Sequence, residues 1–171
     1  LENGVVRTSP GFKEAYAQYV EAGWNALAFP EAHGGQGLPQ TLAITLVDAL
    51  NAACMSFAIG TTLTTGAVKA IMHAGTEEQK RLYLEKMVSG AWTGAMNLTE
   101  PQAGSDLSGV RTKAEPVGDG RYKISGQKIF ITYGDHDLTD NVVHLVLARL
   151  PDAPEGTAGI SMFLVPKVHV N

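Results

Sequence analysis

The spacing of hydrophobic residues changes near Trp92, and this change limits the possible folds more than any other feature of the sequence. Before Trp92, apolar residues recur every three to four positions, as on amphipathic helices; after it, the spacing falls toward two and turn residues separate short β-rich runs. Helices followed by strands, without alternating βαβ units, indicate an α+β fold and argue against a Rossmann domain. We therefore predict an all-α helical domain at residues 1–91 and a domain of antiparallel strands at residues 92–171.

The first helix is predicted to start at Ser9 and Pro10, with serine as the N-cap and proline at the first helical position. Apolar residues keep helical spacing up to Gly23, where this helix is expected to end. The glycine-rich run at residues 33–39 lacks the G-x-G-x-x-G spacing of a dinucleotide-binding loop. We interpret that run as a turn.

Three further helices are expected before the strands begin. Two apolar ones are predicted at residues 40–59 and 63–73. Thr76 and Gln79 have the spacing of a capping box, so a fourth helix should begin there and end at Gly90.

The segment at residues 42–59 is apolar enough to raise the question of a membrane span, but Asp48 and Asn51 lie near its middle. An aspartate at the centre of a bilayer costs roughly 2.5 to 3.5 kcal/mol. We therefore predict no membrane insertion and a helix buried within a cluster of helices.

Charge and cysteine content narrow the possible partners and compartments. Thirteen Lys and Arg against seventeen Asp and Glu give a net charge of −4 without any run of five like charges, which argues against nucleic acid as a partner. Cys54 is the only cysteine, so we expect a reduced compartment such as the bacterial cytoplasm. The five histidines lack the paired spacing of a metal site, and no metal is expected.

The strands are predicted from short β-rich runs between turn residues. A hairpin is expected where the runs at 110–117 and 121–125 flank Gly118-Asp119-Gly120. Further strands are expected at residues 129–132, 142–150 and 160–165, and the near-continuous apolar run at 142–150 indicates a strand covered on both faces.

A loop of small and hydroxyl-bearing residues after Met96 is the best candidate for a binding site. Gly104 allows close approach of a backbone to a ligand, Pro101 stiffens the turn, and Thr99 and Ser105 offer hydroxyl groups. A turn stabilised by its own side chains remains an alternative on composition alone.

Two motifs in the second half resemble those of the acyl-CoA dehydrogenase family. Thr99 to Asp106 match the family signature T-E-P-x-A-G-S-D, and Gly126 to Thr132 match a second element, G-x-K followed by aromatic-Ile-Thr. The similarity extends back to residues 75–80 and forward to residues 163–166. It implies that this chain is a fragment: part of the N-terminal helical domain followed by an incomplete antiparallel β-barrel-like middle domain.

The resemblance implies FAD as the cofactor and assigns roles to particular residues. Thr99 would hydrogen-bond the pyrimidine side of the flavin, the aromatic ring of Phe130 would pack on it, and Thr132 would bond near N5, which receives the hydride. Ser105 would approach the cofactor phosphates and the acyl-CoA substrate. The complete set of expected cofactor-binding residues is Met96, Leu98, Thr99, Gly104, Ser105, Phe130, Ile131 and Thr132. The family usually has tryptophan where Phe130 stands and often a small residue where Tyr133 stands.

The family reaction removes a proton from the α carbon of an acyl-CoA and transfers hydride from the β carbon to FAD, giving a 2,3-enoyl-CoA. The family base is a glutamate in a C-terminal helical domain, so we expect no catalytic residue within this chain. Glu100 is interpreted as an exposed or ion-paired loop carboxylate. The isolated chain is therefore expected to be inactive and to bind FAD weakly.

The resemblance also implies partners and leaves alternatives. It implies an electron-transfer flavoprotein as electron acceptor and a homo-oligomer. The run Thr132 to Asp137 resembles a bacterial branch that includes 3-(methylthio)propanoyl-CoA dehydrogenases. An acyl-CoA oxidase of the same fold and a non-catalytic acyl-CoA- or flavin-binding module are the alternatives.

Overall fold

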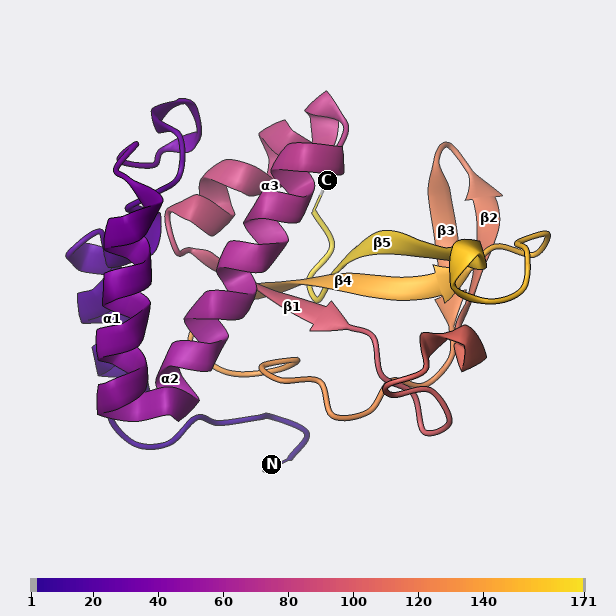
Figure 1. Ribbon diagram of the computed structural model, residues 1–171, viewed down its shortest axis with the longest axis horizontal. Helices are drawn as coiled ribbons and strands as arrows, with labels where there is room; N and C mark the ends of the chain where they lie inside the picture. The colour runs from indigo at the N-terminus through magenta and orange to yellow at the C-terminus, as the bar shows by residue number, and fades with distance from the viewer. Residues whose placement is uncertain (1–2, 171) are drawn as a thin grey trace.

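A computed structural model describes residues 3–170 of the 171-residue chain, with helices at one end and strands at the other (Figure 1). The helices are α1 (Phe12–Glu21), α2 (Gln40–Ala74) and α3 (Glu77–Val88). The strands are β1 (Trp92–Asn97), β2 (Lys113–Gly118), β3 (Arg121–Ser125), β4 (Asn141–Arg149) and β5 (Ile160–Pro166). The predicted α+β fold, with helices before strands, is confirmed.

The start of α1 differs from the prediction. Gly11, not Ser9, is the N-cap residue, and it has a left-handed φ of 87°. The backbone N–H of Phe12 donates to the Ser9 carbonyl at 3.1 Å, which closes a turn over Pro10 and Gly11. Because Gly11 accepts a positive φ, the helix begins at Phe12, three positions after Ser9.

The two apolar helices expected at residues 40–59 and 63–73 are one element, α2. Its interruption lies at Cys54, whose φ of −159° and ψ of 93° are not helical, and the helix continues through Gly60. The expected burial of α2 is wrong for its first half: its buried residues all lie from Phe57 onward, and Leu42, Ile44 and Met55 are exposed. Among residues 3–170, α2 is the one helix long and apolar enough, by length and composition alone, to cross a membrane.

The capping box that begins α3 is confirmed. The Gln79 backbone N–H donates to the Thr76 hydroxyl at 3.2 Å, and the Thr76 N–H donates to the Gln79 side-chain oxygen at 2.9 Å. Two otherwise unpaired donors at the helix start are satisfied in this way.

The sheet is mixed and does not close, so the expectation of purely antiparallel strands is wrong. Strand β4 lies at its centre, with β1 parallel to it and β5 antiparallel to it. Strand β2 joins β4 through a single parallel pair, Lys113 with Arg149, and forms the predicted hairpin with β3. Asp119 and Gly120 have φ of 51° and 69°, as the two central residues of a type I′ turn require.

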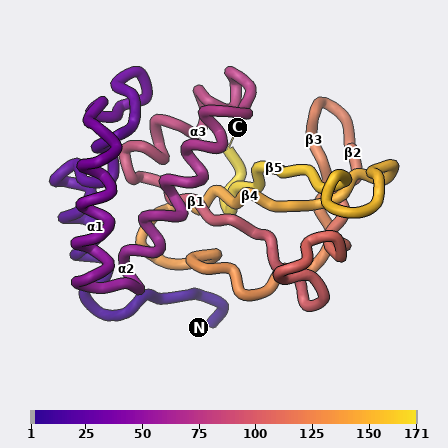
Figure 2. The backbone as a smooth tube through the Cα atoms, viewed as in Figure 1, coloured from indigo at the N-terminus to yellow at the C-terminus, as the bar shows by residue number. Residues whose placement is uncertain are grey.

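The hydrophobic core lies where α2 and α3 cover β1 and β4. Val68, Ile71, Leu84, Met87 and Leu145 are almost completely buried there. The backbone trace in Figure 2 shows α2 passing beside the start of β1. The approach is close enough that a Cβ added at Gly94 would lie 2.4 Å from the Ala67 Cβ.

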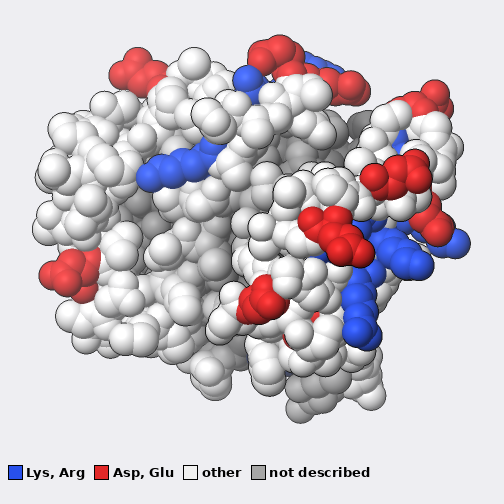
Figure 3. Space-filling view, turned by 45° about the vertical axis from the view of Figure 1, so that its right-hand side comes forward, with Lys and Arg blue, Asp and Glu red and all other residues white. Residues whose placement is uncertain are grey.

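Charged side chains are distributed unevenly over one face of the molecule. On the face in view in Figure 3, Lys, Arg, Asp and Glu gather toward the right, at the end that carries the strands, and are sparser toward the left. Asp48 and Lys69 are the only Asp, Glu, Lys or Arg residues in α2.

Candidate functional site

The two motifs singled out in the sequence lie side by side. The backbone N–H of Ile129 donates to the Thr99 carbonyl at 2.9 Å. The Lys128 ammonium donates to the Leu98 carbonyl, also at 2.9 Å. The loop at 99–106 and the segment at 126–134, separated by the β2–β3 hairpin in sequence, therefore form one surface at the end of β1.

Glu100 organises the interior of the first loop. Its carboxylate accepts hydrogen bonds from the backbone N–H groups of Arg111 and Thr112 at 2.8 and 3.0 Å, and from the Gln102 amide at 2.6 Å. It also forms an ion pair with Lys128 at 2.9 Å, and both side chains are less than a tenth exposed. Of the two roles considered for Glu100, the exposed one is wrong and the ion-paired one is found.

The surroundings of Glu100 keep it ionised. Burial opposes the charged form, but the hydrogen bonds from Lys128 and from the Arg111 and Thr112 backbone outweigh it and lower its pKa to about 2. A carboxylate with this pKa and four hydrogen-bond donors around it is a poor proton acceptor. Its geometry suits a structural role.

The second segment is not the strand expected at residues 129–132. Phe130 and Tyr133 both have a left-handed backbone, with φ of 55° and 51°. This conformation removes them from the β region, so no ladder forms. For bulky residues it costs on the order of 1–3 kcal/mol each, and such strain persists only where the surroundings impose it.

Phe130 is displayed by this backbone toward solvent. Its side chain is 89% exposed, more than any other large hydrophobic side chain among the described residues. The Phe130 ring has almost no contact with the chain, so its packing does not offset the backbone strain. This exposure leaves the ring able to contact another group.

The expected cofactor-binding residues lie in β1, in the loop that follows it and in the segment at 126–134, and in the described chain no side-chain hydrogen bond links them to one another. Met96, Gly104, Ser105, Phe130 and Thr132 are exposed, and Leu98, Thr99 and Ile131 are half-buried. Within residues 3–170, no hydrogen bond engages the hydroxyl groups of Thr99, Ser105 or Thr132. An exposed aromatic ring on one segment, with unengaged hydroxyl groups on that segment and on the first loop, suits a flat, polar-edged ring such as a flavin.

Three residues that shape this surface were not predicted from the sequence. Lys128 was read only as part of a motif, yet its ammonium joins the two segments. The Tyr133 hydroxyl donates to the Ser56 carbonyl of α2 at 2.6 Å. A Cβ added at Gly60 would lie 2.6 Å from the Tyr133 ring. A glycine inside an apolar helical run was the available signal, since it marks a close approach.

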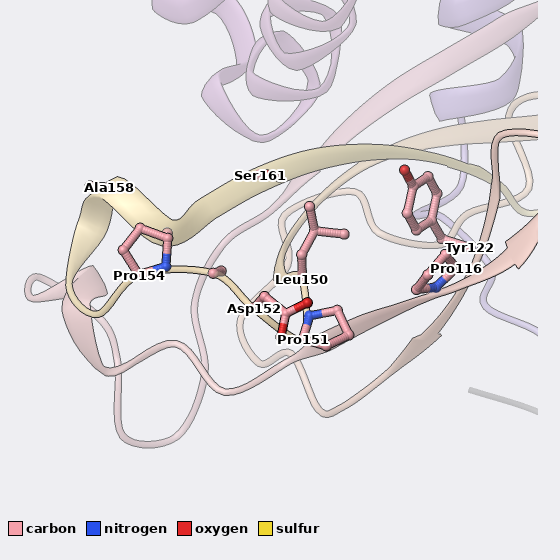
Figure 4. A pocket seen from close by; sticks show the side chains of 10 residues that line it. Pro116, Tyr122, Leu150, Pro151, Asp152, Pro154, Ala158 and Ser161 are labelled. Carbon is pink, nitrogen blue, oxygen red and sulfur yellow. The ribbon is translucent and has the colours of Figure 1, made fainter.

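A cavity on the strand end of the molecule lies away from these residues. It has a volume of about 460 Å³ and is formed by Pro116 and Tyr122 of the hairpin and by the loop from Leu150 to Pro154 (Figure 4). None of the expected cofactor-binding residues lines it. In the part of the chain that the structure describes, no three His, Cys, Asp or Glu side chains cluster as metal ligands would.

Comparisons with known proteins identify two family models in succession. Residues 5–91 match the acyl-CoA dehydrogenase N-terminal domain, and residues 95–171 match the acyl-CoA dehydrogenase middle domain. The chain is 55% identical to a 3-methylmercaptopropionyl-CoA dehydrogenase of Ruegeria pomeroyi, over 98% of this chain and 29% of that protein.

Solved structures give the same result. Butyryl-CoA dehydrogenase from Megasphaera elsdenii superposes with a TM-score of 0.78 at 31% identity, over 95% of this chain and 41% of that one. A glutaryl-CoA dehydrogenase from Mycobacterium smegmatis in complex with FADH2 gives a TM-score of 0.74 at 27% identity, over 90% of this chain and 37% of that one. The chain spans less than half the length of each of these proteins.

Proposed function

The chain belongs to the acyl-CoA dehydrogenase family, and on that premise we propose that it supplies part of the FAD cradle of an enzyme that converts an acyl-CoA to a 2,3-enoyl-CoA. Members of this family bind FAD, and one superposable neighbour is a complex with FADH2. The observation that carries the proposal is the surface made by the two motifs. These motifs carry a strained and exposed Phe130 and the hydroxyl groups of Thr99, Ser105 and Thr132, which nothing in the described chain engages.

The residues of this surface would bind and orient the flavin. Phe130 would offer an apolar ring face, and the hydroxyls of Thr99 and Thr132 would hydrogen-bond its polar edge. Gly104 and Ser105, exposed on the neighbouring loop, would contact the cofactor phosphates and the acyl-CoA. FAD, when bound, supplies the acceptor for the hydride that leaves the β carbon.

The base that removes the α proton would come from a part of the protein outside this chain. Glu100 is unsuited to that role because its carboxylate is buried in an ion pair with Lys128 and its pKa is lowered to about 2. General bases work best with a pKa near the operating pH. We therefore expect the isolated 171-residue chain to be inactive.

The favoured substrate is 3-(methylthio)propanoyl-CoA. The 55% identical relative from Ruegeria pomeroyi supports this choice by its name. An electron-transfer flavoprotein as acceptor, a homo-oligomeric assembly and a reduced compartment such as the bacterial cytoplasm complete the proposal.

The test uses the full-length parent protein, purified and loaded with FAD. We expect anaerobic addition of 3-(methylthio)propanoyl-CoA to bleach the flavin band faster than butyryl-CoA or a long-chain acyl-CoA does. Rapid reoxidation by oxygen with release of hydrogen peroxide would favour the acyl-CoA oxidase. A parent that binds FAD or acyl-CoA but reduces no flavin with any member of the panel would favour the non-catalytic module.

A further inference from the structure

The segment at 126–134 is fixed at two points, one on each side of Phe130. At one end, Lys128 bonds to the first loop through the Leu98 carbonyl and Glu100. At the other end, the Tyr133 hydroxyl donates to the Ser56 carbonyl of α2 at 2.6 Å. Phe130, Ile131 and Thr132 span the distance between these two points.

Tyr133 contacts α2 at a place where the helix has no side chain. A Cβ added at Gly60 would lie 2.6, 2.7 and 2.8 Å from three atoms of the Tyr133 ring, which is too close for any real contact. Gly60 is itself buried within the helical part of α2 that follows the interruption at Cys54, where glycine is otherwise unfavourable. The Tyr133 ring also contacts the His136 ring in an edge-to-face arrangement, with centroids 5.6 Å apart.

We propose that Tyr133 is a positioning residue: its ring, seated against Gly60 of α2, holds Phe130 and Thr132 in the exposed arrangement that the flavin contacts. The inference rests on the proposed function, because it assigns Tyr133 a role in the same cofactor surface. It links Tyr133 to Gly60 of α2, a helix that lies outside both motifs.

The physical argument is one of geometry and strain. Phe130 and Tyr133 both have a left-handed φ, which a free loop of non-glycine residues would relax away. The hydrogen bond to Ser56 and the fit over Gly60 hold Tyr133 from the helix side, one residue after Thr132. Releasing Tyr133 therefore lets Phe130 and Thr132 leave the positions in which they are displayed.

The experiment is a double-mutant cycle in the full-length parent, combining Gly60→Ala and Tyr133→Ser. FAD affinity is measured by titration of the apoprotein, the flavin environment by its visible absorbance, and folding by thermal unfolding of the apoprotein. Gly66→Ala is the matched control, because Gly66 lies in the same helix and an added Cβ would meet nothing within 4 Å in the described residues. Tyr133→Phe keeps the ring and removes only the hydroxyl.

Gly60→Ala is expected to weaken FAD binding roughly 5- to 100-fold in the Tyr133 background, as overpacking does, and to have no further effect once Tyr133 is serine. Tyr133→Phe should weaken FAD binding about two- to tenfold, as the loss of one hydrogen bond does, and Tyr133→Ser more than that. Tyr133→Ser should also shift the flavin absorbance band, which a residue that merely stabilises the fold would leave in place.

Two results would overturn the inference. One is an equal effect of Gly60→Ala in both backgrounds, because the ring would then not be what fills the space. The other is a Tyr133→Ser protein with unchanged FAD affinity and an unchanged flavin band. A wild-type parent that fails to bind FAD would instead count against the proposed function, while the thermal-unfolding cycle would still report whether the two positions interact.

Discussion

The loop at 99–106 and the segment at 126–134 form one surface but are built in opposite ways. The first loop is stabilised from inside, by a buried glutamate that accepts hydrogen bonds from two backbone N–H groups and a lysine. The second segment has an exposed, strained aromatic residue and is held mainly at its ends. The comparison teaches that the most conspicuous acidic residue of the motif supports the site, whereas the less regular segment displays the groups that face a ligand.

Among the predicted changes, removing Glu100 should lower the free energy of unfolding the most. Glu100→Ala leaves the Lys128 ammonium and two backbone N–H groups buried without their partner. Breaking a buried ion pair from one side costs about 3–5 kcal/mol. Urea unfolding of the parent should show this loss. The control is Asp106→Ala, an exposed carboxylate in the same loop that bonds one N–H, where the loss should be much smaller. Similar losses for both would contradict the internal-support role of Glu100.

Acidification should weaken the same loop. The pKa of Glu100 falls from 4.5 to about 2 on folding, so its contribution is complete above pH 4.5 and is lost as the pH falls toward 2. The loss is about 3 kcal/mol, at roughly 1.4 kcal/mol for each pH unit between the two pKa values. Urea unfolding at a series of pH values would measure it. Glu100→Gln should flatten the profile over this range, and an unchanged slope in that variant would assign the acid sensitivity to other groups.

Thr132→Val tests the second segment without disturbing its shape. Valine keeps the volume of threonine and removes the hydroxyl proposed to bond the flavin. Losing one hydrogen bond costs about 0.5–1.5 kcal/mol, equivalent to a two- to tenfold slower flavin reduction in a single turnover. The melting temperature of the parent should change little. An unchanged reduction rate would count against the assignment of Thr132 to the flavin.

Phe130→Gly should produce the smallest change, with stability and binding moving in opposite directions. Glycine accepts positive φ without strain, and the Phe130 ring contributes little packing because it is 89% exposed. We expect a gain of about 0.5–1 kcal/mol in apoprotein stability, together with weaker FAD binding. Denaturant titration and FAD titration of the same preparation measure both. A loss of stability would show that the Phe130 ring supports the fold.

Several local features followed from the sequence because they depend on neighbours in the chain. The capping box of Thr76 and Gln79 and the turn at Asp119 and Gly120 form as predicted, since each is decided within a few residues. The apolar run at 142–150 gave the buried central strand β4. The start of α1 is a local prediction that failed, because Gly11 and not Ser9 is the N-cap. Other failed predictions, such as the expected strand at 129–132, are ones in which a distant partner decided the outcome.

The sequence by itself determined the family, through Thr99 to Asp106 and Gly126 to Thr132, and the order of helices before strands. The tertiary structure alone decided that Glu100 is buried in an ion pair with Lys128 and that β1 pairs parallel to β4. It also decided that the Tyr133 ring packs against Gly60, 73 positions earlier in the chain. The physical reason is that periodicity and capping reflect short-range sterics and hydrogen bonding. Strand direction, ion pairing and the side chain that packs against a helix glycine depend on which surfaces meet when the chain packs.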